Sequence, residues 1–183
     1  MGAETKIRIL DELDRNSSGI HLRQLTKNIQ GSFPNVRRFV QLLEKEGIVK
    51  TEQRANLLNI TLKNSPQTLA YLKLVHTFKF LTLSMPQQNA IQEFLFKLPV
   101  MPLIVTISPD ASHISLIFQK VEKEKEVLNL AKLISHQYQT RFLPIIIEYA
   151  ELEKYPEKIP SDSQTVLRGL EYYYHLLWRK THD

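Results

Sequence analysis

Apolar side chains recur every three or four residues in two segments near the start of the chain, residues 5–14 and 21–30. This spacing places them on one face of a helix, so it predicts two amphipathic helices with a loop between them. Ile20, just before the second segment, is expected to add a short strand. The apolar positions are Ile7, Leu10 and Leu13 in the first segment and Leu22, Leu25 and Ile29 in the second.

A third helix is predicted between Ser32 and Gly47, after a turn centred on Gly31. Ser32 is a favourable N-cap residue, and Pro34 suits the first turn of a helix. Gly47 readily adopts the left-handed conformation with which many helices end. Along this helix the expected inward positions are Val36, Val40 and Leu43, with Phe39 partly buried.

Two short strands are predicted to follow the third helix. Residues 48–51 and 57–62 alternate between the two faces of a strand in the manner of a paired hairpin. Residues 52–56, which lie between them, are expected to form the hairpin tip. The three helices and the hairpin together predict an N-terminal domain over residues 1–64.

The next helix is unusually apolar. Ser65 and Pro66 are suited to its start, and residues 65–85 form the predicted linking helix. A helix that is apolar on more than one side needs two packing partners. The N-terminal domain supplies one partner, and the second domain or another subunit supplies the other. Our preferred hypothesis is a homodimer formed through this helix. Its apolar residues are Leu69, Tyr71, Leu72, Leu74, Val75, Phe78, Phe80, Leu81 and Leu83.

Helices and apolar, β-branched strands alternate in the remaining chain, which predicts a small α/β domain over residues 86–183 with a sheet of three or more strands. The final helix carries a cluster of aromatic residues that we expect to pack on the sheet: Tyr172, Tyr173, Tyr174 and Trp178. The predicted elements are a helix at 88–98, strands at 103–107 and 113–121 around a turn at 108–111, a helix at 122–138, a strand at 142–149, a short helix at 150–155 and a helix at 163–178.

The order helix, turn, helix and hairpin resembles the winged helix-turn-helix of bacterial and archaeal transcription regulators, over about residues 4–64. The segment Leu-Glu-Lys-Glu-Gly-Ile-Val at residues 43–49 is the part most typical of that family. The resemblance implies that the third helix enters the major groove of double-stranded DNA.

Four polar residues are left on the outer side of this third helix, and they are the side-chain types that read bases. Arginine can bind guanine through two hydrogen bonds, and asparagine or glutamine can bind adenine in the same way. The alternative is a solvated polar face used for protein contacts. We expect base contacts from Asn35, Arg37, Arg38 and Gln41, and phosphate contacts from Lys27, Lys50, Arg54 and Lys63.

Charge is unevenly distributed along the chain, whose formal net charge is +5. Residues 1–85 hold 13 basic and 7 acidic residues, whereas residues 86–183 hold 11 basic and 12 acidic residues. The positive half therefore coincides with the predicted DNA-binding domain, where a polyanion would bind.

The order of elements over residues 88–178 is similar to that of the minimal nucleotidyltransferase fold. The segment Pro-Asp-Ala-Ser-His-Ile-Ser-Leu-Ile-Phe at 109–118 resembles that family's Ser-Asp-Ile-Asp-Leu strand. Residues 142–154 and 166–174 resemble its third strand and closing helix.

The resemblance implies a Gly-Ser loop and two aspartates that hold magnesium, and this chain departs from both. Ser108 is followed by Pro109, and the aspartate positions are occupied by His113 and Ser115. Neutral side chains do not gather a hard magnesium ion, so we expect an inactive transferase site. The acids left nearby, which we consider only as a residual metal site, are Asp110, Glu148 and Glu151.

Several other classes of chemistry lack their sequence signatures. The chain has no cysteine, which excludes disulfides, thiolate zinc sites and a cysteine nucleophile. Its five glycines form no phosphate-binding loop, and no hydrolase or metalloprotease motif occurs. There is no signal-peptide apolar region and no apolar run long enough for a membrane span. We expect a cytoplasmic protein that is not an enzyme and has no cofactor or metal.

The sequence thus predicts an α+β protein in which a winged helix-turn-helix is joined by a long helix to a small α/β domain. The expected function is sequence-specific binding of double-stranded DNA, as a transcription regulator and homodimer. The second domain would sense a small ligand, bind a protein partner or mediate assembly. One alternative is a protein-interaction module of a larger complex, and another is a nucleotide-binding or nucleotidyltransferase protein with a divergent site.

Overall fold

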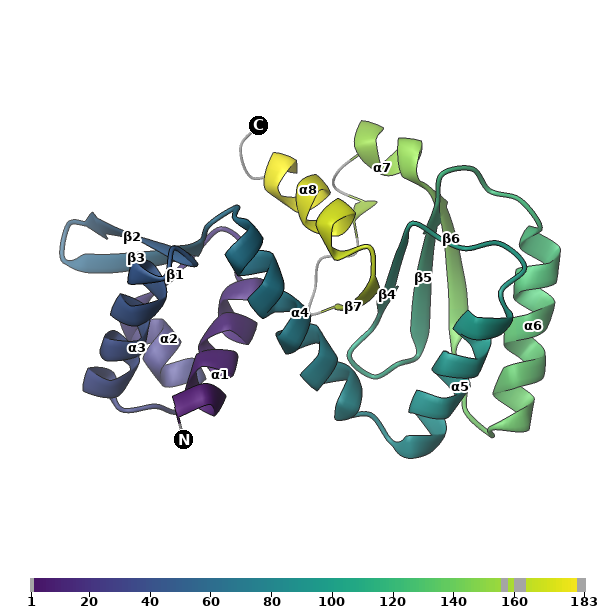
Figure 1. Cartoon of the computed structure of the whole chain (residues 1–183), viewed down its shortest axis with the longest axis horizontal. Coiled ribbons are helices and arrows are strands. Elements are labelled where there is room, and N and C mark those ends of the chain that lie inside the picture. Colours follow the sequence, from purple (N-terminus) through teal and green to yellow (C-terminus); the bar gives the residue numbers. More distant parts are fainter. Residues whose placement is uncertain (1, 156–157, 160–163, 181–183) are drawn as a thin grey trace. The chain divides into compact units, whose positions relative to one another are not determined.

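The computed structural model describes residues 2–155, 158–159 and 164–180. In these residues the fold is mixed α+β, with eight α-helices and two β-sheets (Figure 1). The chain divides into two units, Met1–Val75 and His76–Asp183, and the division falls within one helix, α4 (Pro66–Leu81).

The N-terminal unit contains three helices and a three-stranded antiparallel sheet of order β1-β3-β2. The short strand expected at Ile20 is confirmed, because Ile20 lies opposite Ile60 of the hairpin. The elements are α1 (Gly2–Arg15), β1 (Ile20–His21), α2 (Leu22–Asn28), α3 (Phe33–Lys45), β2 (Val49–Arg54) and β3 (Leu57–Leu62).

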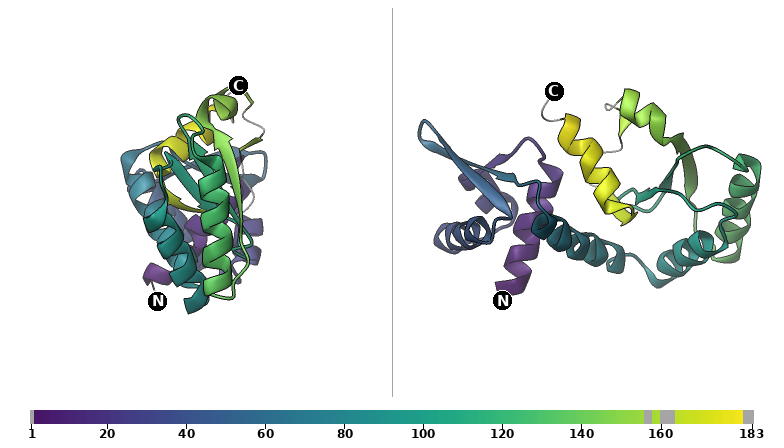
Figure 2. Two further views of the ribbon diagram at one scale, coloured as in Figure 1. Left: turned by 90° about the vertical axis from the view of Figure 1, so that its right-hand side faces the viewer. Right: turned by 45° about the horizontal axis from the view of Figure 1, so that its top comes forward.

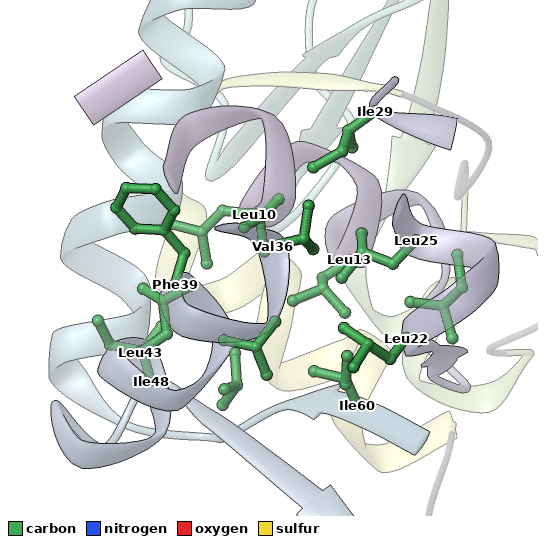
Figure 3. Packing of buried hydrophobic residues seen from close by; sticks show 14 of the residues in the cluster. Leu10, Leu13, Leu22, Leu25, Ile29, Val36, Phe39, Leu43, Ile48 and Ile60 are labelled. Atoms are coloured by element: carbon green, nitrogen blue, oxygen red, sulfur yellow. The ribbon is translucent and has the colours of Figure 1, made fainter. Parts of the chain in front are cut away.

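Apolar side chains from all three helices and from the sheet meet in one core (Figure 3). The inward positions predicted for the third helix are confirmed, since Val36, Val40 and Leu43 are all buried. Phe39 was expected to be partly buried and is in fact buried as well. The burial of one face of α3 determines which face stays available to a partner.

Helix α3 begins and ends near the predicted residues. Ser32 occupies the N-cap position, but its side chain makes no capping hydrogen bond with the described residues. At the other end Gly47 has φ +74°, as expected, and its N–H donates to the Glu44 carbonyl. The next amide, of Ile48, donates to the Leu43 carbonyl at 2.9 Å, which completes a Schellman motif.

The hairpin is longer and its tip tighter than predicted. Arg54 pairs with Leu57, so the connection consists of Ala55 and Asn56 alone, rather than residues 52–56. Ala55 has φ +51°, a left-handed conformation that glycine or asparagine usually supplies in a two-residue turn. Residues 52–54 are all polar, so they show no alternation that would reveal the full length of β2, and no glycine marks the tip.

The C-terminal unit contains a four-stranded sheet of order β6-β5-β4-β7, in which β5 and β6 are parallel and the other pairs are antiparallel. The elements after α4 are α5 (Met85–Lys97), β4 (Ile104–Ile107), β5 (His113–Phe118), α6 (Glu124–Gln137), β6 (Leu143–Glu148), α7 (Tyr149–Lys154), β7 (Thr165–Arg168) and α8 (Leu170–Lys180).

The sheet of the C-terminal unit is covered on both faces at its centre. Ile114, Leu116 and Phe118 of β5 pack with α5 and α6 in one apolar cluster. Ser115 and Ile117, which alternate with them, are also buried, on the opposite face. Helix α8 contacts β4 and β7 and lies on the other side of the sheet from α6 (Figure 2).

The helix predicted at residues 163–178 is a strand followed by a shorter helix. Residues 165–168 form β7, whose Thr165 and Val166 pair with β4, and α8 begins only at Leu170. Gly169 separates the two with φ +69°, and a Cβ there would lie 2.0 Å from the Leu103 carbonyl oxygen. A helix cannot continue through this residue, so the prediction was wrong for residues 165–169. Ser163 lies outside the described residues.

The remaining predicted elements are confirmed with shifts at their ends. Strand β5 ends at Phe118 rather than at residue 121, and α6 begins at Glu124, after Lys123 in a left-handed conformation. No helix of the described residues is both long and apolar enough to cross a membrane.

Candidate nucleic-acid interface

The outer side of α3 is solvent-exposed over its whole length. All four residues expected to contact bases have exposed side chains: Asn35, Arg37, Arg38 and Gln41. The burial of the opposite face against the core holds the helix in place, so these side chains belong to a rigid element rather than to a loop.

The four residues do not point in one direction. Successive residues of an α-helix are rotated by about 100°, so Arg37 and Asn35 are separated by about 160° around the axis. Arg38 and Gln41 point away from the buried stripe, between these two flanks. A partner that approaches α3 from the side opposite to the buried stripe can therefore contact Arg37, Arg38 and Gln41 together. Asn35 lies at the edge of the exposed side, on the flank opposite to Arg37.

A further cation shares this outward direction. Lys45 follows Arg38 by seven residues, which is about two helical turns, and its side chain is exposed. Sequence reasoning missed Lys45, although its heptad spacing from Arg38 was a sufficient signal. Arg38 also lies over the Phe39 ring, with 5.4 Å between the guanidinium carbon and the ring centroid.

The acidic residues nearest α3 are directed elsewhere. The Glu44 carboxylate accepts hydrogen bonds from the backbone N–H and the hydroxyl of Thr51 on β2. Glu46 accepts a bond from Lys6 of α1 at 2.6 Å, and this contact raises the pKa of Lys6. No carboxylate of the described residues pairs with Arg37, Arg38 or Lys45. The outer face of α3 is therefore positively charged and uncompensated.

A hollow of about 240 Å³ lies between the start of α3 and the hairpin. Arg37 forms part of its wall together with Arg23 of α2, and Gln53 and Asn56 line it from the hairpin side. The Nδ1 atom of His21, also in the lining, is enclosed and has no hydrogen-bond partner among the described residues. The full lining is His21, Leu22, Arg23, Phe33, Arg37, Gln53, Asn56, Leu57 and Leu58.

The residues predicted to contact phosphates are not gathered at this hollow. Lys27, Lys50 and Lys63 are exposed, but none of them is among its lining residues. Lys50 lies opposite Thr61, on the face of the hairpin turned away from the core, because the neighbouring Ile60 is buried. The side chain of Arg54 lies outside the described residues. The polar residues that sequence reasoning missed, Arg23, Gln53 and Asn56, come together only when the hairpin folds beside α3.

In the C-terminal unit, the turn between β4 and β5 is held by its own polar groups. The Asp110 carboxylate accepts hydrogen bonds from the Ser108 hydroxyl at 2.6 Å and from the backbone N–H and hydroxyl of Ser112. These bonds, that of Ser108 first, lower the pKa of Asp110 well below its usual range. The carboxylate is thus occupied in stabilising the turn.

The three acids considered for a metal site have separate partners. Glu148 accepts the backbone N–H of Val121 at 3.0 Å, and Glu151 accepts a bond from Lys158 at 2.6 Å. Asp110 is engaged in its own turn. Among the described residues no group of three or more histidine, aspartate or glutamate side chains has an arrangement that could hold a metal ion. His113 is exposed and Ser115 is buried.

His76 is a structural residue inside the C-terminal unit. The Val166 N–H donates to its Nδ1 at 3.2 Å, and its Nε2 lies 2.9 Å from the Tyr174 hydroxyl. Because Nδ1 accepts the hydrogen bond from the Val166 N–H, Nε2 carries the ring hydrogen and donates to the Tyr174 hydroxyl. The expected packing of the aromatic cluster is confirmed, since Tyr173 and Tyr174 are buried and the half-exposed Tyr172 meets Tyr149 edge to face.

Comparisons of the chain with models of protein families, with curated proteins and with solved structures found no match.

Proposed function

We propose that the chain binds double-stranded DNA through the outer face of α3 and acts as a transcription regulator. In this proposal the N-terminal unit is a winged helix-turn-helix, with α2 and α3 as the helix pair and β2–β3 as the wing. The observation that carries it is the row of exposed cations on α3, Arg37, Arg38 and Lys45, which no carboxylate of the described residues neutralises.

Three features support a duplex as the partner. An α-helix of ordinary width fits the major groove, and arginine and glutamine are residue types that read base edges there. Arg23 and Arg37 both line the hollow beside α3, so that one further cation flanks the helix. The unit as a whole is basic, which favours a polyanion and gives salt-dependent affinity.

The site residues have distinct expected roles. We propose that Arg37, Arg38 and Gln41 contact bases and that Lys45 and Arg23 contact phosphates. Asn35, on the far flank, reaches bases only if the helix enters the groove by its N-terminal end. The phosphate roles of Lys27, Lys50, Arg54 and Lys63 remain part of the proposal, as contacts at the edges of the duplex.

The C-terminal unit is proposed to serve assembly or sensing rather than catalysis. In the nucleotidyltransferase-like alignment, the metal positions hold His113 and Ser115, and neutral groups of this kind do not bind magnesium with phosphate. The proposal includes a homodimer, because paired half-sites in DNA match a protein with two-fold symmetry.

The test is a binding series with fluorescently labelled duplexes selected from genomic fragments. Arg37→Ala and Arg38→Ala should each weaken a selected site by about 1–3 kcal/mol. Arg8→Ala is the matched control, because Arg8 is an exposed arginine of the same unit whose partner is Glu4 on α1. An affinity for duplex DNA that does not change with salt concentration would reject the proposal.

A protein-interaction module is the second candidate, and one observation favours it. Three large apolar side chains are partly exposed on or beside α3: Phe33, Leu42 and Leu57. Exposed apolar groups at a surface mark protein contacts more often than DNA contacts. In this case Leu42→Ala would abolish binding to the protein partner, and no duplex would bind in a salt-sensitive manner.

A further inference from the structure

Strand β6 is an edge strand with unusual composition and exposure. Among the described strands it pairs with β5 on one side only. Every residue of β6 is at least partly exposed, whereas β4 is buried along its whole length. Its sequence, Leu-Pro-Ile-Ile-Ile-Glu, is nevertheless almost entirely apolar. Apolar edge strands readily pair with a further strand, and proteins usually protect them with charges.

The backbone of β6 offers unused hydrogen-bonding groups at the free edge. The Leu143 N–H donates to the Ser112 carbonyl at 2.8 Å, so the odd-numbered residues direct their backbone groups toward β5. The amides of Ile146 and Glu148 therefore point to the open side. Neither amide has a backbone partner among the described residues. Pro144 also points to the open side, where its missing N–H costs no bond to β5.

Apolar side chains accompany this free edge. Leu143 and Ile145 are 49% and 43% exposed. They lie on the face opposite to Ile146, which packs against the cluster formed with α5 and α6. The only charged side chain of the strand, Glu148, is held by the Val121 N–H at the strand's end. The strand thus lacks the charges that would prevent pairing.

We propose that β6 pairs antiparallel with the β6 of a second copy, so that two four-stranded sheets become one continuous sheet. This proposal deepens the homodimer included in the proposed function and rests on it. The two-fold axis lies at Ile146, where each copy's Ile146 N–H donates to the carbonyl of the partner's Ile146. Each Glu148 N–H then donates to the carbonyl of the partner's Pro144. This hydrogen bond uses only the carbonyl of the proline, so the missing N–H of the proline does not matter.

Charge and symmetry favour a second copy as the occupant. Residues 76–183 hold 12 basic and 12 acidic residues, so this unit carries no net charge that would oppose self-association, whereas residues 1–75 hold 12 basic and 7 acidic residues. The edge is self-complementary about Ile146, and an isologous interface of this type closes with two subunits. Ile145 lies opposite the partner's Ile147 in this register, which extends the exposed apolar row across the interface.

The apolar residues exposed on α4 are the competing surface. Leu74, Phe78 and Leu81 are about half exposed and follow a heptad-like spacing. A helical seam is usually stable only when it continues over three or four heptads, and α4 is 16 residues long. The β6 edge offers backbone hydrogen bonds in addition to apolar contact, and it is therefore the interface that we propose.

The first experiment measures the oligomeric state of full-length variants by sedimentation velocity over a range of concentrations. Ile145→Lys and Leu143→Lys should each raise the dissociation constant of the dimer by about tenfold or more, because lysine at an edge opposes pairing. Leu133→Lys on α6, an apolar position that is more exposed than either of these, should leave the dissociation constant unchanged. A wild-type chain that is monomeric at every concentration overturns the proposal. Loss of the dimer in Phe78→Lys but not in Ile145→Lys also overturns it, in favour of α4.

The second experiment needs no variant, because it measures the protection of the backbone amides at the free edge of β6. Amide hydrogen exchange should show Ile146 and Glu148 protected at high protein concentration and exposed at low concentration. Rapid exchange of both amides at all concentrations would overturn the pairing and leave the edge available to a strand of another protein.

The outcomes separate this inference from the proposed function. A chain that is always monomeric but binds duplex DNA contradicts the β6 pairing and the homodimer, and it leaves the proposal of DNA binding through α3 standing. A chain that dimerises through β6 but binds no duplex contradicts only the DNA-binding proposal.

Discussion

The two units carry equal numbers of basic residues and differ in their acids. Residues 1–75 and 76–183 each hold 12 lysines and arginines, but the first unit has 7 acids and the second has 12. In the N-terminal unit two acids of α1 pair with arginines of the same helix, Glu4 with Arg8 and Asp11 with Arg15. Glu44 and Glu46 are engaged away from the outer face of α3. The outer face of α3 is thus positive because no acid of the described residues lies on it, and not because the N-terminal unit has more cations than the C-terminal unit.

The C-terminal unit uses its acids differently. Glu93 accepts a bond from Lys97 within α5, and its bonds from Gln137 and the Tyr138 hydroxyl join α5 to the end of α6. Asp110 stabilises a turn. These acids neutralise the unit and support its fold, which leaves it suited to association with neutral surfaces. The two units therefore differ in where their acids lie, and in the proposed function this difference separates the DNA-binding unit from the unit that associates with a second copy.

Charge reversal on α3 should produce the largest effect. Arg37→Glu combined with Arg38→Glu is expected to weaken a selected duplex by at least about 100-fold and to reduce the salt dependence of binding. The matched variant of the other unit, Lys125→Glu with Lys132→Glu on α6, should change little. Fluorescence anisotropy at two salt concentrations measures both. Equal losses of duplex affinity in the two variants would contradict a specific role of α3, since net charge alone would then explain binding.

A buried hydrogen-bond network should affect only the second unit. His76→Phe removes the acceptor for the Val166 N–H and the donor to Tyr174, so the free energy of unfolding should fall by about 1–3 kcal/mol. Urea denaturation followed by circular dichroism gives the loss, and His76→Gln should recover part of it. DNA affinity below the unfolding transition should equal that of the wild type. A reduced affinity there would contradict the assignment of binding to α3.

A single acid introduced into the outer face of α3 tests whether the absence of acids there matters for duplex affinity. Gln41→Glu places a carboxylate between Arg37 and Arg38 and should reduce duplex affinity by about tenfold. Gln41→Ala is the control for loss of the amide and should have a smaller effect. Titration of the same labelled duplex measures both variants. If the two variants lose affinity equally, the absence of acids on this face is not what matters.

The smallest effect concerns pH and Asp110. Because hydrogen bonds from Ser108 and Ser112 lower the pKa of Asp110 below its ordinary value of 3.8, its stabilising contribution is present above that value. The contribution is lost as the pH falls further. The wild-type chain should therefore lose thermal stability below about pH 4 more steeply than Asp110→Asn. Melting curves of both chains at pH 6 and pH 3 test this. An identical fall in melting temperature for the wild type and Asp110→Asn would contradict it.

Much of the N-terminal unit could be predicted because its signals are local. The spacing of Val36, Val40 and Leu43 on one helix was enough to identify the buried face and hence the exposed one. Gly47 marked the end of α3 because its left-handed conformation follows from its missing side chain. The exposure of Arg37 and Arg38 followed from the same periodicity.

Features that depend on distant partners could not be predicted in this way. Residues 165–168 form a strand because they pair with β4, and four residues next to a helical segment carry too short a pattern to reveal it. The hollow beside α3 brings Arg23, Arg37 and Gln53 together from three elements. The interpretation of residues 52–54 as a loop failed because β3 supplies their hydrogen bonds.

By itself, the sequence determined the α+β class, the helices of the first unit and the exposed basic face of α3, since periodicity and glycine conformation act within a few residues. Only the tertiary structure decided that β7 is a strand, that His76 bonds to residues 90 and 98 positions away, and that β6 ends a sheet with its edge open. These features require long-range pairing, whose partners no local pattern identifies, because they are selected by the burial and hydrogen bonding of the whole unit.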